Sequence, residues 1–262
     1  MSNLRHVAQA CPPLPSPVTA LTYEFEAGHT IPLHHHPEDQ LVYASRGVMT
    51  VRTDGGTWVV PSQRAVWIPA RTPHSIVISG AASMRTIYFR AQMVRCLRRT
   101  CWVINVSPLL RELIQHACTY PQLNRRSRSH RHLIDFILDQ LKTLKSVPLQ
   151  LPNLSDPRAV RVADALRRYP SNECSVEQLC RNAGACKRTL ERLFLAETGM
   201  TIGRWRQQLR LQRSLELLAS GEKVTHAAME AGYSTPSAFI AMFRSALGTT
   251  PGRYFEGTRT AS

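Results

Sequence analysis

Residues 231–254 read AGYSTPSAFIAMFRSALGTTPGRY, and this stretch predicts a turn followed by a helix that ends at a glycine. Gly232 can adopt the left-handed backbone conformation that ends a preceding helix, and Ser234 or Thr235 can cap the next one. Pro236 falls in the first turn of that helix, where its missing N–H does no harm. Three large apolar residues recur at intervals of four and form one buried face: Phe239, Phe243 and Leu247. The stretch therefore predicts a helix-turn-helix.

This pattern resembles the C-terminal signature of the AraC/XylS family of bacterial transcription regulators, which reads roughly GYSS, SAF, FR, G-x-TP and Y. The resemblance implies two helix-turn-helix units in one domain, each inserting a helix into the major groove of DNA. A matching upstream pattern is present. Ser175–Gln178 form a capping box, Gly184 makes a turn, and residues 186–199 (CKRTLERLFLAETG) form another predicted recognition helix. A helix over residues 203–219 would separate the two units.

The two recognition helices differ in what they offer DNA. On the family pattern, the solvent-facing positions of the first helix can bond base edges: Lys187, Arg188, Glu191 and Arg192. The corresponding positions of the second helix carry few polar groups: Pro236, Ser237, Ile240 and Ala241. We therefore predict that the first unit supplies most base specificity, while the second anchors, with Ser237 and Ile240 touching bases. Five arginines are expected at phosphates: Arg204, Arg206, Arg210, Arg244 and Arg253.

Cys186 stands where the family usually has a serine that caps the first recognition helix. A thiol caps poorly, so the helix should lose stability on the order of 1 kcal/mol. A redox role is the alternative interpretation, but the sequence indicates no resolving partner for this cysteine.

The formal net charge of +15 favours a polyanionic partner, and double-stranded DNA is the one that fits the motif. Membrane lipids or simple solubility would also suit such a charge, and the arginine runs in the N-terminal half fit a solvated surface equally well. The chain has seven cysteines, no CxxC pair, no secretory signal and no apolar run of membrane-spanning length. We therefore expect a bacterial cytoplasmic protein that lies at the nucleoid, without disulfides or membrane contact.

The N-terminal half predicts an all-β domain. Leu21, Tyr23 and Phe25 alternate with polar residues, as in a half-buried strand. Six more predicted strands follow: QLVYAS, VMTVRT, TWVVP, RAVWIPA, HSIVISG and MRTIYF. Turn signals separate them at 54–56 and 79–80. Roughly seven short strands at this spacing indicate a sandwich or jelly-roll barrel.

Part of this domain resembles the cupin family. Gly28, His34, His36, Gln40 and Gly47 match the spacing of the first cupin motif, with Gln40 in place of its usual glutamate. A second motif is recognisable from Pro69 to His74, with Arg71 in place of its usual glycine. The resemblance implies a cupin-like β-barrel, and its metal-ligand positions are occupied by His34, His36, Gln40 and His74.

Two interpretations of these four residues remain open. They could bind zinc or another divalent metal through imidazole and amide ligands, or they could be a hydrogen-bonded lining of a ligand pocket without metal. Strand alternation places residues 34 and 36 on one face and His35 on the other. Because the glutamate is missing, the site lacks an obvious catalytic base. Redox or hydrolytic chemistry is therefore not expected, and no residue is assigned a catalytic role.

In regulators of the AraC/XylS family, which this chain resembles, such a barrel senses a small-molecule effector. Three aromatic residues could form an apolar wall for that molecule: Tyr43, Trp58 and Trp67. Each of them could equally be part of the hydrophobic core.

Two helices are predicted in the middle of the chain. One opens at Ser107–Pro108 with a cap and a first-turn proline, and its apolar stripe comprises Leu109, Leu110, Leu113, Ile114 and Ala117. The other runs over residues 129–146, with its apolar positions at Leu133, Ile134, Ile137, Leu138, Leu141 and Leu144. These helices could pair two subunits or dock on the barrel; the family resemblance favours a homodimer.

Taken together, these patterns predict an α+β protein with two domains. The predicted segments are a disordered N-terminus (1–18), the cupin-like sensing domain (19–95), a helical connector (96–147), a linker (148–157) and an all-α DNA-binding domain with two helix-turn-helix units (158–257). Asp156–Pro157 should start its first helix, with an apolar stripe at Val160, Ala163, Leu166 and Tyr169.

We predict a sequence-specific transcriptional activator or repressor that responds to a small molecule in the cupin-like domain. RNA polymerase is a further candidate partner, and an adjacent transporter, efflux or metabolic gene is a candidate target. A metal-dependent cupin enzyme with a nucleic-acid-binding domain is the alternative. A regulator whose barrel serves only for assembly is a third interpretation.

Overall fold

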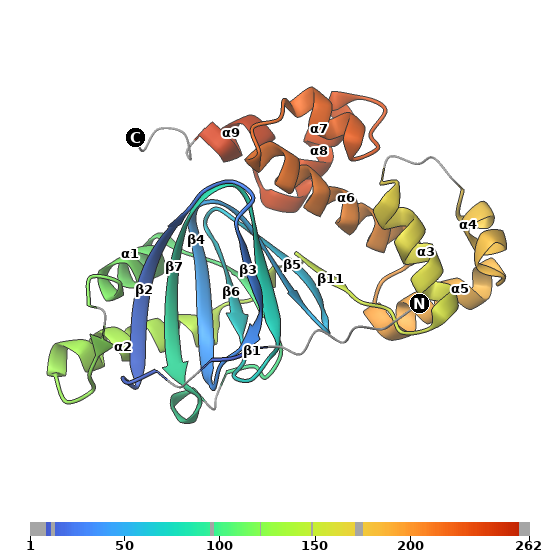
Figure 1. Cartoon of the computed structure of the whole chain (residues 1–262). Coiled ribbons are helices and arrows are strands. Elements are labelled where there is room, and N and C mark those ends of the chain that lie inside the picture. The colour runs from blue at the N-terminus through green and yellow to red at the C-terminus, as the bar shows by residue number, and fades with distance from the viewer. Residues whose placement is uncertain are drawn as a thin grey trace. The chain divides into compact units, whose positions relative to one another are not determined.

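The computed structural model describes residues 9–11, 14–94, 97–120, 122–147, 149–170 and 175–256. These divide into two compact units (Figure 1). The sheet unit comprises Met1–Asp54 and Trp58–Gln150, and the helical unit comprises Gly55–Thr57 and Leu151–Ser262. None of the helices in the described part of the chain has the length and apolar character needed to cross a membrane.

The sheet unit is built on two long antiparallel strands, β4 (Glu38–Thr53) and β7 (His74–Arg90). β7 also pairs with β2 (Val18–Phe25) and β3 (Thr30–His35), and β4 with β6 (Arg64–Ile68). The remaining strands are β1 (Gln9–Ala10), β5 (Gly56–Pro61), β8 (Trp102–Asn105), β9 (Gln122–Leu123), β10 (Ser146–Val147) and β11 (Gln150–Pro152), with a 3-10 helix at Ala91–Met93. The main strand order is β1-β3-β7-β4-β6-β8-β10.

Four predicted strands are in fact two: QLVYAS and VMTVRT are parts of β4, and HSIVISG and MRTIYF are parts of β7, where the expected turn at residues 79–80 does not form. Gly80 lies inside β7 with φ 71°, and Gly47 lies inside β4 with φ 80°. The register of the β4–β7 pair shifts around Arg46. Such a shift is typical of a β-bulge, which bends a strand without ending it. The expected turn after Asp54 is confirmed and joins β4 to β5.

Gly47 provides a test of this bend. A Cβ at this position would lie 2.5 Å from the carbonyl oxygen of Ala81, in addition to the left-handed φ. We expect Gly47→Ala to lower the free energy of unfolding by about 3 kcal/mol or more, because strain and clash add. Gly28→Ala is the matched control: its φ is 81°, but a Cβ there meets nothing within 4 Å. Chemical denaturation of both variants measures the difference, and equal losses would contradict the role of close packing at Gly47.

Most of the predicted disordered segment, residues 1–18, lies outside the described residues. Of the described portion, Gln9–Ala10 form β1, which pairs in parallel with β3, and Val18 begins β2.

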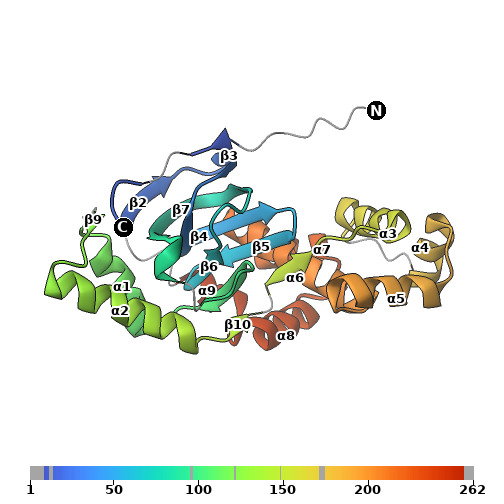
Figure 2. The same cartoon turned by 90° about the horizontal axis from the view of Figure 1, so that it is seen from below.

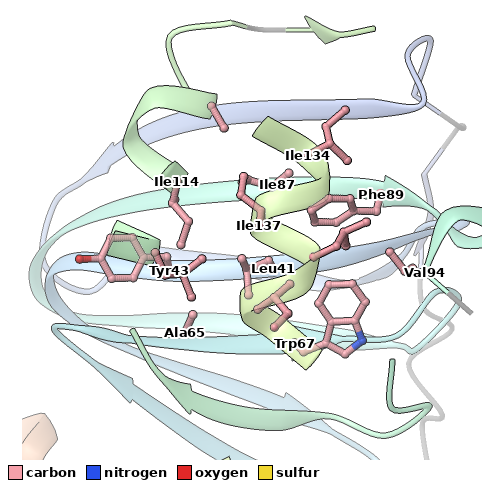
Figure 3. Packing of buried hydrophobic residues seen from close by; sticks show 14 of the residues in the cluster. Leu41, Tyr43, Ala65, Trp67, Ile87, Phe89, Val94, Ile114, Ile134 and Ile137 are labelled. Atoms are coloured by element: carbon pink, nitrogen blue, oxygen red, sulfur yellow. The ribbon is translucent and has the colours of Figure 1, made fainter. Parts of the chain in front are cut away.

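The middle helices, α1 (Pro108–Ala117) and α2 (Arg128–Thr143), dock on the sheet of their own unit. Figure 2 shows them side by side. Figure 3 shows Ile114, Ile134 and Ile137 facing sheet residues that include Leu41 and Phe89, all in one buried cluster. Because α1, α2 and β8 share the core of the sheet unit, residues 96–147 are not a separate connector. Of the predicted α1 stripe, Leu109 faces away from this core and is 54% exposed.

The helical unit contains seven helices in the described part of the chain. They are α3 (Pro157–Arg168), α4 (Val176–Ala183), α5 (Lys187–Thr198), α6 (Ile202–Ala219), α7 (Val224–Glu230), α8 (Pro236–Leu247) and α9 (Pro251–Glu256). Local chemistry sets their ends. The side chains of Asp156, Ser175 and Thr235 accept hydrogen bonds at the N-termini of α3, α4 and α8, and Gly184 and Gly248 end α4 and α8 in left-handed conformations.

The core of the helical unit includes two packed aromatic residues. The rings of Phe194 on α5 and Trp205 on α6 lie 5.8 Å apart, edge to face, and both side chains are fully buried. On α3 the buried residues are Ala159, Val162, Ala163 and Leu166. Tyr169, predicted to share that stripe, is 58% exposed because it follows the last turn of the helix.

Candidate functional site

Three predicted histidines meet at one end of the sheet unit. His34 near the end of β3 is in register with His74 at the start of β7, and His36 follows β3 directly. The ring centres of His34 and His74 lie 4.3 Å apart, and those of His36 and His74 lie 5.2 Å apart. One ring nitrogen from each of the three lies within 4.8 Å of those of the others. The structure thus brings together residues far apart in the sequence.

Hydrogen bonds determine which nitrogen of each ring carries the proton. Each Nδ1 atom contacts the backbone carbonyl oxygen of a residue two positions away, at 2.8 Å for His34–Pro32, 2.9 Å for His36–Glu38 and 2.8 Å for His74–Thr72. A carbonyl oxygen only accepts, so each neutral ring has its proton on Nδ1 and a lone pair on Nε2. The Nε2 atom of His74 is buried and has no hydrogen-bond partner among the described residues. Metal-binding histidines typically have one ring nitrogen held by a carbonyl oxygen in this way, which leaves the other free for the ion.

Gln40 adds a fourth acceptor to the cluster. The Thr86 hydroxyl donates to the carbonyl oxygen of Leu41 at 3.1 Å and accepts from the Gln40 Nε2 amide at 3.0 Å. These two hydrogen bonds orient the Gln40 amide so that its Oε1 atom points toward the His36 Nε2 atom, at a distance of 3.1 Å. With a neutral ring, two acceptors face one another without a proton between them. Either a proton on His36 or a cation bound to both atoms would relieve their repulsion.

Burial disfavours the proton. Desolvation lowers the pKa of His36, and desolvation first, with neighbouring histidines adding to it, lowers the pKa of His74 to about 3. Both imidazoles are therefore neutral at pH 7. Neutral imidazole nitrogens and an amide oxygen are donors that zinc and similar divalent ions accept. The chemistry of the four side chains fits a bound cation better than a bound proton.

A cavity of about 280 Å³ adjoins this cluster. His34, Gln40 and His29 contribute to its lining, and the rest of the lining is mostly apolar or aromatic: Tyr23, Phe25, Ile31, Ile76, Met84 and Tyr88. The rings of Phe25 and His29 stack 4.7 Å apart, and Tyr88 meets His36 edge to face at 5.1 Å. Among the described lining residues there is no Asp, Glu, Lys or Arg. The cavity is therefore lined mostly by apolar and aromatic side chains, and two of the four clustered residues, His34 and Gln40, open onto it.

The predicted aromatic wall is wrong for Tyr43 and Trp67. Gln40 faces the cavity, so alternation along β4 turns Leu41 and Tyr43 to the opposite face, and Trp67 pairs with Leu41 in register. Both aromatic side chains lie in the core beneath α1 and α2 (Figure 3). Trp58 is 3% exposed and is not among the residues that line the cavity. The same alternation in β2 could have pointed to Tyr23 and Phe25, which were predicted only as strand residues.

On α5, the four predicted base-contacting residues differ in their contacts. The side chains of Arg188 and Arg192 are exposed and have no intramolecular partner among the described residues. Lys187 pairs with Glu177 of α4 through an Nζ–Oε1 contact of 2.9 Å. The Glu191 Oε2 atom accepts the backbone N–H of Ile202 at 3.1 Å, at the start of α6. Arg188 and Arg192 are therefore the members of this set that are available to a ligand.

The remaining predicted DNA contacts also divide by exposure. Ser237 on α8 is exposed, as are Arg204, Arg244 and Arg253, while Ile240 and Arg206 are half-buried. Arg210 is engaged within the unit: its Nε donates to the carbonyl oxygen of Pro170 at 3.1 Å, and its guanidinium lies 5.7 Å from the centre of the Tyr233 ring.

Cys186 occupies the N-cap position of α5, and its side chain makes no capping hydrogen bond. Its Sγ atom lies 3.2 Å from the Thr189 hydroxyl oxygen. The capping hydrogen bond that a serine could supply is therefore not made by this thiol, while the expected loss of helix stability stays a prediction.

Two protein families match this sequence. Residues 17–151 match the family described as "AraC-like ligand binding domain", and residues 179–257 match the one described as "Helix-turn-helix domain". The histidine cluster and its cavity fall within the first match, and α5 and α8 within the second.

Among known proteins, the chain is similar to the "HTH-type transcriptional regulator NimR" of Escherichia coli, with 34% identity over 89% of this chain and 85% of the relative. It is also similar to the "HTH-type transcriptional activator RhaR" of Klebsiella pneumoniae, with 31% identity over 37% of this chain and 35% of the relative. A crystal structure of ToxT from Vibrio cholerae covers 94% of this chain and 99% of its own, with 11% identity and a TM-score of 0.41.

Proposed function

Because this chain belongs to the AraC family of transcriptional regulators, we propose that it binds operator DNA through two helix-turn-helix units and responds to a small molecule held in a cupin-like sheet domain. Its relatives are named as transcriptional regulators, and the chain acts as a regulator rather than an enzyme. The proposal is carried by two features that occur in the same chain. One is the mostly apolar cavity beside the histidine cluster, and the other is the exposed pair Arg188 and Arg192 on α5, a helix that follows a tight turn.

The pairs α4–α5 and α7–α8 are proposed as the two DNA-binding units. In each, a glycine in the left-handed region separates the helices, Gly184 with φ 69° and Gly232 with φ 78°. Exposed Arg188 and Arg192 on α5 read base edges, and α8 anchors the domain with its short side chains. Phosphate contacts come from the exposed Arg204, Arg244 and Arg253. Arg210 has a structural role, because its guanidinium is already engaged.

Glu191 was predicted to contact a base, but in the structure it accepts a hydrogen bond from the start of α6. A variant of Glu191 can distinguish these two roles. We expect Glu191→Ala to lower the free energy of unfolding by about 1 kcal/mol, because the N-terminus of α6 loses an acceptor for the Ile202 N–H. Binding to all operator variants should weaken alike. Glu191→Gln keeps an acceptor oxygen and serves as the control, with most of the stability retained. Denaturation and titration on operators that differ at single base pairs measure both quantities; altered preference at one base pair in Glu191→Ala would instead make Glu191 a base reader.

We further propose that His34, His36, His74 and Gln40 hold zinc or a similar divalent ion. Support comes from the unpartnered Nε2 atom of His74 and from the facing acceptors of His36 and Gln40. When bound, the ion supplies a centre of positive charge and an acceptor of electron pairs beside the cavity. His34 and Gln40 both line that cavity, so a molecule within it would be close to the ion.

Regulation requires that the effector bind two states of the protein with different affinity, because only a difference in affinity shifts the equilibrium between them. We propose that the protein acts as a homodimer, for which α1 and α2 offer the exposed apolar residues Leu109 and Phe136, 54% and 59% exposed. Contact with RNA polymerase and control of a neighbouring transporter, efflux or metabolic gene complete the proposal.

Footprinting of genomic DNA with the purified protein tests this function. We expect discrete protected sites, and a change in their occupancy when zinc or the correct effector is added. Metal analysis of the same preparation reports whether the ion is present. Binding that shows no preference for any sequence would overturn the regulatory role, whereas selective binding by protein that takes up no added zinc would overturn the metal site alone.

A further inference from the structure

The chain departs from the cupin motif at Gln40, and this departure bears on the charge of the effector. Resting on the proposed metal site, we infer that the cavity takes a small aromatic or apolar anion whose negatively charged oxygen binds the ion. Gln40 is then the residue that selects for the charge of the ligand.

The four proposed ligands contribute no negative charge. Three are imidazoles whose Nδ1 protons are held by carbonyl oxygens, and the fourth is an amide whose orientation the Thr86 hydroxyl determines. A divalent ion in this site therefore keeps both of its positive charges. A buried cation without compensation is costly, so the site favours a ligand that brings a negative charge.

Two buried acids beside the cluster, Glu38 and Asp39, offset only part of this charge. Alternation along β4 turns Asp39 to the face opposite Gln40, where its carboxylate accepts the backbone N–H of Ala70 at 2.9 Å. Glu38 is 4% exposed, and its backbone oxygen accepts the His36 Nδ1 proton. One oxygen of its carboxylate accepts the N–H of Leu14 at 2.9 Å. The metal-competent cluster of described residues contains three histidines. Neither Glu38 nor Asp39 belongs to this cluster, so each can act only as an outer counter-charge, and the ion keeps its positive charge toward the cavity.

The other residues that line the cavity determine the size and polarity of the part of the ligand that does not bind the ion. Phe25 and Tyr23 stack with ring centres 5.7 Å apart, and the aliphatic side chains of Ile31, Ile76 and Met84 complete the lining. A cavity of about 280 Å³ is at the small end for bound organic molecules. These walls suit a compact ring with one polar group. Because no Lys or Arg is among the described lining residues, the ion is the full positive charge that the cavity offers to a carboxylate or phenolate.

Gln40 therefore has a defined role. A glutamate here, as in the usual motif, would place a negative charge at the ion and leave less attraction for an anionic ligand. The amide keeps a ligand oxygen without that charge. Gln40→Glu should consequently retain zinc and lose affinity for the anion, which separates ligand selection from metal binding.

The test uses phenylacetate and its uncharged analogue phenylacetamide, titrated calorimetrically into the zinc-loaded full chain. We expect phenylacetate to bind at least about tenfold more tightly than phenylacetamide, and to lose that advantage in protein freed of metal and in Gln40→Glu. With cobalt in place of zinc, phenylacetate should also change the visible absorption of the ion.

Three results would overturn the inference while leaving the metal site intact. They are equal binding of the two molecules by zinc-loaded wild-type protein, no binding of phenylacetate at millimolar concentration, and unchanged phenylacetate affinity in zinc-loaded Gln40→Glu. A wild-type protein that takes up no zinc would overturn the metal proposal and this inference together. The wild-type comparison does not depend on how well the variant folds.

Discussion

Replacing Arg188 or Arg192 with alanine should weaken binding to the preferred operator by about 1–3 kcal/mol for each residue. Both side chains are exposed on α5 and have no intramolecular partner among the described residues. A guanidinium can donate two parallel hydrogen bonds to O6 and N7 of guanine, and alanine leaves these acceptors without protein partners. Titration of each variant on the cognate site, and on sites changed at single base pairs, measures the loss and the position at which discrimination relaxes.

The matched controls are arginines proposed at phosphates. Arg244→Ala and Arg253→Ala remove the same charge from exposed positions, so they should weaken binding to all sequences alike. Each should also reduce the slope of log affinity against log salt by about 0.9 for every phosphate that the protein no longer neutralises. If Ser237→Ala and Ile240→Ala cost as much at the cognate site as the α5 variants do, α8 reads the bases and the assignment is reversed.

The helical unit could be predicted closely from the sequence because its helix ends depend on local chemistry. A serine, threonine or aspartate accepts the first free N–H groups of a helix and a glycine ends it, and each acts on residues only a few positions away in the sequence. Thr235 and Gly248 bound α8 in this way. The engagement of Glu191 was missed because it joins two helices, and no spacing within α5 reveals an acceptor for Ile202.

The sheet unit could be predicted less well, because its register is set by contacts between distant residues. Alternation placed His34 and His36 on one face, whereas His74 on β7 was expected beside them only from the cupin resemblance; the structure brings all three together. Alternation could not show that α1 and α2 cover the face that carries Tyr43 and Trp67. Nor could a glycine in the sequence show whether it ends a strand or bends one; Gly80 bends β7.

Replacing His74 with alanine should abolish the stabilisation of the protein by zinc. A ligand that binds only the folded state adds about 2.7 kcal/mol to the free energy of unfolding at 100 times its dissociation constant. In wild-type protein we expect a zinc-dependent gain of this order. The variant loses one of three imidazole ligands that converge from β3 and β7, so its affinity for zinc should fall by at least about 100-fold. Loss of a residue that only hydrogen-bonds to a metal ligand typically lowers metal affinity by about 10- to 100-fold, and loss of a ligand itself should cost more. Denaturation with and without zinc measures both values.

His35 is the matched control for this experiment, because it is a histidine of the same run that alternation turns to the other face of β3. His35→Ala should keep the full gain from zinc, since its ring is not part of the metal-competent cluster of described residues. Comparing the gain with zinc, rather than the absolute stability, removes the cost of the cavity that His74→Ala leaves in the core, because that cost is present with and without the ion. A gain that survives in His74→Ala would place the ion elsewhere, whereas equal losses in both variants would indicate general binding to surface histidines.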